Sequence, residues 1–156
     1  DIYGKTKSLG EVPQGGVLIL RCSIIGPDPI EKKGLLEWFL TQPDGKRVDG
    51  YTDYLWNGVT TLQFAELCER IIVQDCFNGI WNESPSHHFC PNRPVSKYEL
   101  LQIFKSVFKT EVTIKPLTSG GTPVSRVLGT CYNSLKELFG YDRTMERAMQ
   151  DLLTEM

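Results

Sequence analysis

The chain has 156 residues, 40% of them hydrophobic, and its 17 basic and 19 acidic side chains give a net charge of −2. This length fits one domain with a buried core, and the apolar share excludes a disordered chain. A charge near zero without a long Lys/Arg run argues against a nucleic-acid partner, and the absence of an apolar run near the roughly 18 residues of a bilayer span argues against a membrane partner.

The chain contains an odd number of cysteines, namely Cys22, Cys68, Cys76, Cys90 and Cys131. A chain of this size folds without disulfide bonds, and an unpaired set is typical of reduced thiols. We therefore expect a cytoplasmic protein.

The first half of the chain predicts helices that alternate with strands. Residues 3–9 are expected to end a helix. The apolar run at 17–22 predicts a strand buried on both faces, as in a parallel sheet, and residues 35–40 predict a short helix. Thr60 and Gln63 have the spacing of a capping box, which predicts the start of another helix. The expected apolar stripe of that helix consists of Phe64, Leu67, Cys68, Ile71 and Ile72.

The second half continues the alternation. Residues 79–82 predict a strand, and a loop rich in Ser, His, Asn and Pro follows. Ser96 and Glu99 form a second capping box at the start of a helix. Three more elements are expected, a strand at 112–114 and helices at 132–138 and 144–153. We therefore predict an α/β fold with three or four strands.

Tyr3 and Lys7 are four residues apart, which places them on one face of a helix. A nearby ammonium group lowers the pKa of a tyrosine from about 10, so that the phenol can exchange a proton with a carbonyl or alcohol oxygen. Tyr132 and Lys136 have the same spacing, so spacing alone does not assign a site.

The segment YGKTKSLGE at residues 3–11 resembles the active-site helix of extended short-chain dehydrogenases/reductases. It is most similar to the group related to dTDP-4-dehydrorhamnose reductase. Four later segments resemble the same family in the same order, at residues 20–26, 56–61, 95–101 and 125–128. The resemblance implies the C-terminal half of a Rossmann-like α/β fold, with a small, partly parallel sheet and flanking helices. Residues 1–26 would end the Rossmann-like core, and residues 27–156 would form the substrate-binding region.

The resemblance also implies a role for individual residues. Tyr3 would be the catalytic acid/base, and Lys7 would lower its pKa and hold the nicotinamide ribose. Cys22, Ser23 and Ile24 would lie beside the nicotinamide. The nucleotide-sugar substrate would be lined by Trp56, Asn57, Gly58, Val59, Thr60 and Arg126. The implied function is part of an NAD(P)-dependent oxidoreductase of polysaccharide biosynthesis, a reductase or alternatively an epimerase or dehydratase, in which NAD or NADP performs the hydride chemistry.

The family's glycine-rich dinucleotide loop should precede Tyr3, and Gly120-Gly121 does not replace it because no strand-to-helix turn surrounds that pair. We therefore expect this chain alone to bind no nicotinamide cofactor. The sequence opens at Asp1 rather than at a methionine, and we expect it to belong to a longer protein. Apolar surface left without its usual cover would favour a homodimer.

Several alternatives remain open. His87, His88 and Cys90, with Cys76 upstream, could hold zinc, but the C-x₂₋₄-C spacing of structural zinc sites is missing, so we predict an exposed loop and no metal. Arg126 could clamp a diphosphate or form a surface ion pair. The alternative function is a stand-alone, non-catalytic module that binds a nucleotide sugar or a protein partner.

Overall fold

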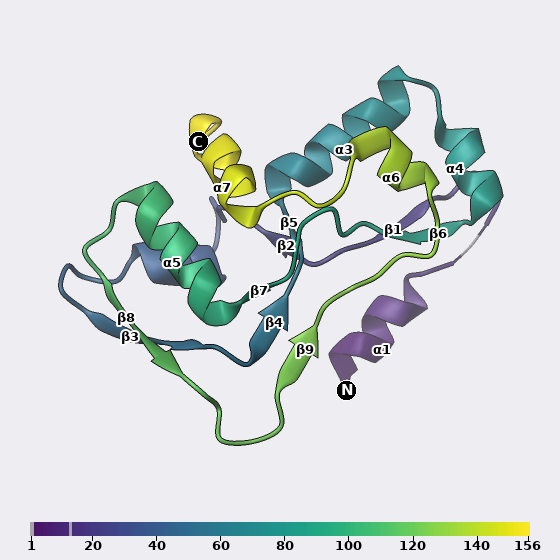
Figure 1. Ribbon diagram of the computed structural model, residues 1–156. Coiled ribbons are helices and arrows are strands. Elements are labelled where there is room, and N and C mark those ends of the chain that lie inside the picture. The colour runs from purple at the N-terminus through teal and green to yellow at the C-terminus, as the bar shows by residue number, and fades with distance from the viewer. Residues whose placement is uncertain (1, 13) are drawn as a thin grey trace.

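The protein was analysed as a computed structural model that describes residues 2–12 and 14–156, with the side chain of Tyr3 outside the description. Helices α2, α5 and α7 gather on one side of the molecule and α3, α4 and α6 on the other, with short strands between them (Figure 1). The helices are α1 (Ile2–Leu9), α2 (Leu35–Leu40), α3 (Thr61–Val73), α4 (Phe77–Glu83), α5 (Lys97–Phe108), α6 (Ser134–Phe139) and α7 (Met145–Thr154).

The described residues form nine short strands rather than the predicted three or four. They are β1 (Ile19–Arg21), β2 (Ile24–Ile25), β3 (Arg47–Tyr51), β4 (Tyr54–Trp56), β5 (Val59–Thr60), β6 (Ser86–His88), β7 (Val95–Ser96), β8 (Thr113–Leu117) and β9 (Val124–Arg126). Strands of two to five residues are too short to show a hydrophobic period, which is why the sequence prediction missed most of them.

These strands form small, mostly parallel sheets. Three parallel pairs join β1 to β6, β2 to β5 and β3 to β8. In a three-stranded sheet, β4 pairs in parallel with β9 and antiparallel with β7. The predicted α/β class and the small, partly parallel sheet with flanking helices are therefore confirmed.

Both predicted capping boxes are present. The Thr60 hydroxyl accepts from the Gln63 backbone N–H, and the Gln63 side chain accepts from the Thr60 N–H, which begins α3. Ser96 and Glu99 make the same reciprocal bonds at the start of α5. These bonds depend only on local spacing, so the sequence alone locates both helix starts.

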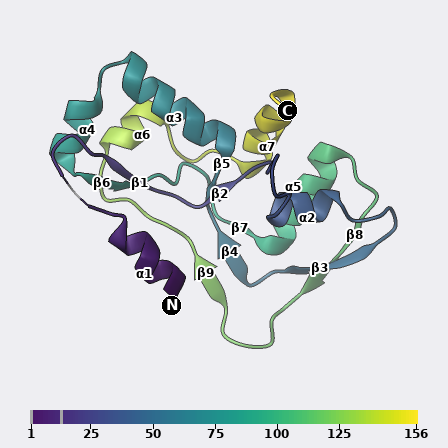
Figure 2. The ribbon, with the colours of Figure 1, turned by 180° about the vertical axis from the view of Figure 1, so that it is seen from behind.

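Two hydrophobic cores hold the molecule together. The first lies between α2, α5 and α7, where the Phe39 and Phe104 rings are 5.7 Å apart. Seen from behind, α2 lies in front of α5 (Figure 2). The second core lies between α3, α4, α6 and the residues after β6, where Phe89 meets Phe139 edge-on at 4.9 Å.

Four predictions about local structure were wrong. Residues 79–82 belong to helix α4, because Ile80 packs into the second core at helical spacing. The predicted loop contains strand β6, which pairs with β1. Strand β1 is parallel as predicted, but it is half-buried to exposed rather than buried on both faces. Ile72 is 77% exposed because it faces away from the core that Leu67 and Ile71 of the same helix enter.

Candidate functional site

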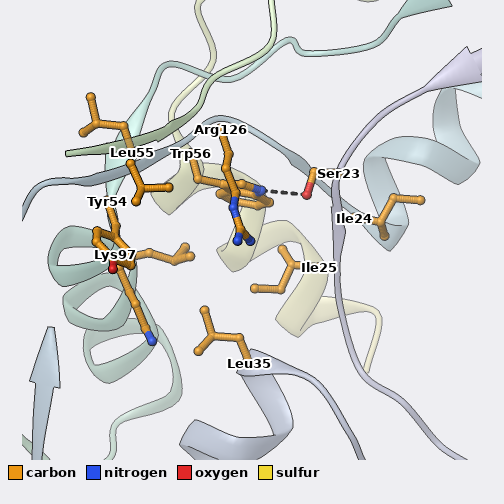
Figure 3. A pocket seen from close by; sticks show the side chains of 11 residues that line it. Ser23, Ile24, Ile25, Leu35, Tyr54, Leu55, Trp56, Lys97 and Arg126 are labelled. Carbon is orange, nitrogen blue, oxygen red and sulfur yellow. Dashed lines mark hydrogen bonds between the residues drawn. The ribbon is translucent and has the colours of Figure 1, made fainter. Parts of the chain in front are cut away.

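A cavity of about 410 Å³ opens where strands of two sheets meet two helices. Strands β2, β4 and β9 and helices α2 and α5 provide its walls (Figure 3). It is lined by Ser23, Ile24, Ile25, Leu35, Tyr54, Leu55, Trp56, Lys97, Leu100, Val124 and Arg126. The cavity therefore combines Ser23 and Ile24, predicted on the nicotinamide side, with Trp56 and Arg126, predicted on the sugar-nucleotide side.

Trp56 holds a central place in the wall of this cavity. Its backbone pairs with Val95 in β7 on one side and with Arg126 in β9 on the other. Its indole Nε1 donates a hydrogen bond to the Ser23 hydroxyl oxygen at 2.7 Å (Figure 3). The ring is thus fixed at both ends, by the sheet and by the segment between β1 and β2.

Gly58 allows this arrangement. A Cβ atom at this position would lie 2.0 Å from Cζ2 of Trp56 and 2.2 Å from the Ser23 carbonyl oxygen, far inside van der Waals contact. The Val59 backbone N–H donates to the same Ser23 oxygen at 2.8 Å. Only a residue without a side chain permits so close an approach, so glycine positions Trp56 against Ser23.

Other predicted substrate-lining residues support the wall from outside the cavity. Asn57 is 4% exposed, and its amide exchanges two hydrogen bonds with the Leu128 backbone, at 2.9 and 2.8 Å. Val59 is fully buried in the second core, and Thr60 caps α3. Their side chains are engaged with the protein itself, so they do not line the cavity.

Cys22, predicted beside the nicotinamide, packs against the second core instead of lining the cavity. Burial, with a smaller contribution from neighbouring Cys68, raises the pKa of the Cys22 thiol to about 11. The sulfur is therefore protonated at neutral pH and has little thiolate character.

The predicted catalytic pair belongs to helix α1. The described residues of α1 are exposed, and Lys7 is among them. Because the Tyr3 side chain lies outside the described residues, the structure gives no geometry for its phenol. The catalytic pairing of Tyr3 and Lys7 stays a prediction.

Tyr54 and Lys97 line the cavity but were not predicted as site residues. Tyr54 stacks on Tyr51, with ring centroids 4.6 Å apart. Lys97 is the first residue of α5 and lies inside a predicted capping box, directly after its N-cap residue Ser96. The sequence therefore located Lys97 on its helix, but only the pairing of β7 with β4 brings that helix start to the cavity.

The two adjacent histidines have separate structural environments. His87 is 1% exposed, with Nε2 lying 3.0 and 2.9 Å from the carbonyl oxygens of Ile80 and Ser84. Nδ1 of His88 lies 2.8 Å from the Gly129 carbonyl oxygen. The described part of the chain holds no cluster of three or more His, Cys, Asp or Glu side chains able to bind a metal. None of its helices is long and apolar enough to span a bilayer.

No protein-family model matches the sequence, and no curated protein matches it. Solved structures are similar in fold. A dTDP-4-dehydrorhamnose reductase (RfbD ortholog) from Clostridium acetobutylicum has a TM-score of 0.63 at 16% identity, and the match covers 99% of this chain and 54% of that one. The dTDP-4-dehydrorhamnose reductase of Bacillus anthracis, solved with NADP, has a TM-score of 0.69 at 11% identity, with 99% and 53% covered. UDP-glucose 4-epimerase from Thermotoga maritima, solved with UDP-glucose, has a TM-score of 0.54 at 16% identity, with 99% and 50% covered.

The chain spans about half the length of these solved structures. At these identities the likeness concerns the fold alone. The resemblance seen in the sequence, to extended short-chain dehydrogenases/reductases of the dTDP-4-dehydrorhamnose reductase group, is thus confirmed at the level of the fold.

Proposed function

We propose that this chain forms part of an NAD(P)-dependent oxidoreductase that acts on a nucleotide-linked sugar, and that it contributes the substrate pocket and the Tyr3/Lys7 pair. In this proposal, residues 1–26 end the Rossmann-like core and residues 27–156 form the substrate region. The reaction is a reduction, with epimerisation or dehydration as the alternatives. The observation that carries the proposal is the cavity, which unites Ser23 and Ile24 with Trp56 and Arg126.

The residues present fit a nicotinamide cofactor at one wall of the cavity. Ile24 is about half exposed and offers an apolar surface for a flat ring beside Ser23. The ammonium group of exposed Lys7 is suited to donate hydrogen bonds to ribose hydroxyls. The cofactor, when bound, supplies hydride transfer.

The rest of the chemistry belongs to side chains of this chain. Trp56 presents its ring to the substrate, and its hydrogen bond to Ser23 fixes the ring orientation. Arg126 supplies a guanidinium that can bind phosphate oxygens through two parallel hydrogen bonds. Tyr3 exchanges a proton with the substrate oxygen through its phenol, and the Lys7 ammonium favours the phenolate form.

The test compares Tyr3→Phe with Tyr132→Phe in the protein that contains this chain. Tyr132 is the matched control because Lys136 lies four residues after it, as Lys7 lies four after Tyr3. We expect Tyr3→Phe to abolish turnover of a dTDP- or UDP-linked sugar while nicotinamide binding persists, and Tyr132→Phe to retain turnover. Wild-type turnover by Tyr3→Phe would overturn the catalytic assignment. Nucleotide-sugar binding without any turnover by the wild-type protein would favour the non-catalytic module instead.

A further inference from the structure

A second cavity, of about 260 Å³, lies at the start of helix α7 and shares no lining residue with the cavity described above. It lies between α7, the segment that precedes it and the first turn of α3, which packs against α7. Its volume is below the roughly 300 Å³ at which pockets for drug-sized ligands begin, so it suits a small ligand. Its lining residues are Gln63, Arg143, Thr144, Arg147, Ala148 and Asp151.

Two arginines dominate the charge of this cavity. The Arg143 guanidinium donates from Nη2 to the Phe139 carbonyl oxygen at 3.0 Å and lies 4.2 Å from the centre of the Phe139 ring, which fixes its position. Arg147 places Nε 3.0 Å from the Asp151 carboxylate. A guanidinium has five N–H donors, so each arginine keeps donors beyond these bonds. The described lining residues include two basic groups and one acidic group, which leaves the cavity with a net positive charge.

A buried hydrogen-bond donor also faces this cavity. Gln63 is 4% exposed, and its amide exchanges two hydrogen bonds with the Asn92 amide, at 3.0 and 2.8 Å. The second N–H of Asn92 donates to the Gly58 carbonyl oxygen at 2.7 Å. The Gln63 amide also has two N–H groups, but within the described part of the chain only one of them has an acceptor. A buried N–H without an acceptor is costly, and because Gln63 lines the cavity, a ligand oxygen there can accept from it.

The first turn of α7 strengthens the preference for an anion. Thr144 caps this helix by accepting from the Arg147 backbone N–H, and the first N–H groups of a helix carry partial positive charge. Two guanidinium groups, an amide N–H and a helix start therefore surround one small space. Donors in this combination match the oxygens of a phosphate group.

We propose that this cavity is a second ligand site, which binds a phosphate group through Arg143, Arg147 and the second amide N–H of Gln63. The phosphate is either the free ion or part of a small phosphorylated metabolite, because both present the same oxygens. The ligand competes with Asp151 for Arg147, so the carboxylate limits the affinity. The inference is independent of the proposed function, because the two cavities share no lining residue.

The test is an NMR titration of the isotope-labelled full chain with inorganic phosphate and, separately, with glycerol phosphate, at an ionic strength held constant with potassium chloride. The side-chain amide signals of Gln63 report on this cavity, so phosphate bound near Arg126 does not affect the result. The variants are Arg147→Met, which removes a guanidinium, and Asp151→Asn, which removes the competing carboxylate. Arg47→Met is the matched control, because Arg47 is exposed on β3 and does not line this cavity.

Both test positions belong to one partly exposed ion pair, whose loss costs little stability, so the variants should fold like the wild type. Thermal unfolding of each variant confirms this.

We expect phosphate, but not chloride, to shift the Gln63 signals with saturation. Arg147→Met should weaken the affinity about fivefold or more, Asp151→Asn should strengthen it about threefold or more, and Arg47→Met should bind like the wild type. Tighter binding of glycerol phosphate than of phosphate would support the site with a phosphorylated metabolite as its ligand, and the reverse order would support it with the free ion. The inference is overturned if phosphate leaves the Gln63 signals unchanged or if chloride moves them equally. It is also overturned if Arg147→Met and Asp151→Asn both bind within about twofold of the wild type.

Discussion

The indole nitrogen of Trp56 donates a 2.7 Å hydrogen bond to the hydroxyl of Ser23, 33 residues earlier in the chain. Ser23 lies between β1 and β2, and Trp56 ends β4. The bond therefore joins two walls of the cavity and restrains the orientation of the Trp56 ring there. Because both partners are at least half-buried, an unpaired indole N–H at this place is costly.

Replacing Ser23 with alanine should destabilise the protein. The substitution leaves the Trp56 N–H without its acceptor, so we expect the free energy of unfolding to fall by about 1–3 kcal/mol. Urea unfolding followed by tryptophan fluorescence measures this change. Ser125→Ala is the control, because Ser125 is exposed on β9, and it should change the stability by less than about 0.5 kcal/mol. Equal stability of the two variants would show that the Trp56 bond contributes nothing.

Gly58→Ala should be among the most damaging small substitutions in the chain. Its methyl group would meet both the Trp56 ring and the Ser23 carbonyl oxygen, so the cavity wall must shift. We expect a loss of about 1–3 kcal/mol, as for overpacked cores. Gly79→Ala provides the opposite control, because its methyl group would meet nothing within 4 Å inside helix α4. Alanine there should stabilise the protein by about 0.5–1 kcal/mol. Both effects can be measured as shifts in the urea midpoint, and a shift of the same sign in both variants contradicts this account.

Asn57→Ala tests whether Asn57 acts on the structure. The variant leaves the N–H and C=O of Leu128 without their partners in a part-buried setting, so we expect the stability to fall by about 1–3 kcal/mol. Exposed Asn78 of α4 supplies the control variant Asn78→Ala. Chemical denaturation compares the two. If Asn57→Ala matched this control in stability yet lost nucleotide-sugar binding, a direct role on the substrate would replace the structural one.

The cysteines should react with iodoacetamide in an order set by exposure and pKa. Cys131 is exposed, whereas burial raises the pKa of Cys22 to about 11 and also raises that of Cys90. A raised pKa keeps the thiol protonated at pH 8, and only the thiolate reacts. Mass spectrometry of timed samples should therefore show Cys131 alkylated before Cys22 and Cys90. In urea all five should react at similar rates, and early labelling of Cys22 in the native protein would contradict its burial.

Asp53 should make stability depend on acid pH. Hydrogen bonds from the Ser119 hydroxyl, at 2.6 Å, and from the Ser119 backbone N–H hold the pKa of Asp53 below its usual value. A carboxyl with a lowered folded-state pKa contributes stability above its unfolded pKa of about 4, and that contribution disappears as the pH falls through the folded pKa. The stability difference between wild type and Ser119→Ala should therefore shrink between about pH 5 and pH 2. Unfolding curves recorded across this pH range measure this difference. The side chain of Asp53→Asn does not titrate, so the stability of that variant should lack the loss that Asp53 causes at acid pH. A difference that is constant with pH would exclude this linkage.

Local features of the fold were predictable because their causes are local in sequence. The capping boxes at Thr60 and Ser96 need only three-residue spacing, and helix α2 at Leu35–Leu40 follows directly from its apolar run. Residues 79–82 show the limit of such reasoning. A segment this short is compatible with either a strand or a helix. In the structure it is part of helix α4, whose residue Ile80 packs into the second core.

For the site, the sequence determined which residue types were available, and tertiary structure decided which of them meet. The resemblance identified Ser23, Ile24, Trp56 and Arg126, all of which line the cavity, but it also included Asn57, Val59 and Thr60, whose side chains bind or pack elsewhere. Lys97 was placed on its helix by the sequence and in the cavity only by the pairing of β7 with β4. The reason is physical. Helix caps form between residues a few positions apart, whereas a pocket forms where strands distant in sequence pair, and short strands leave no local pattern that specifies their partners.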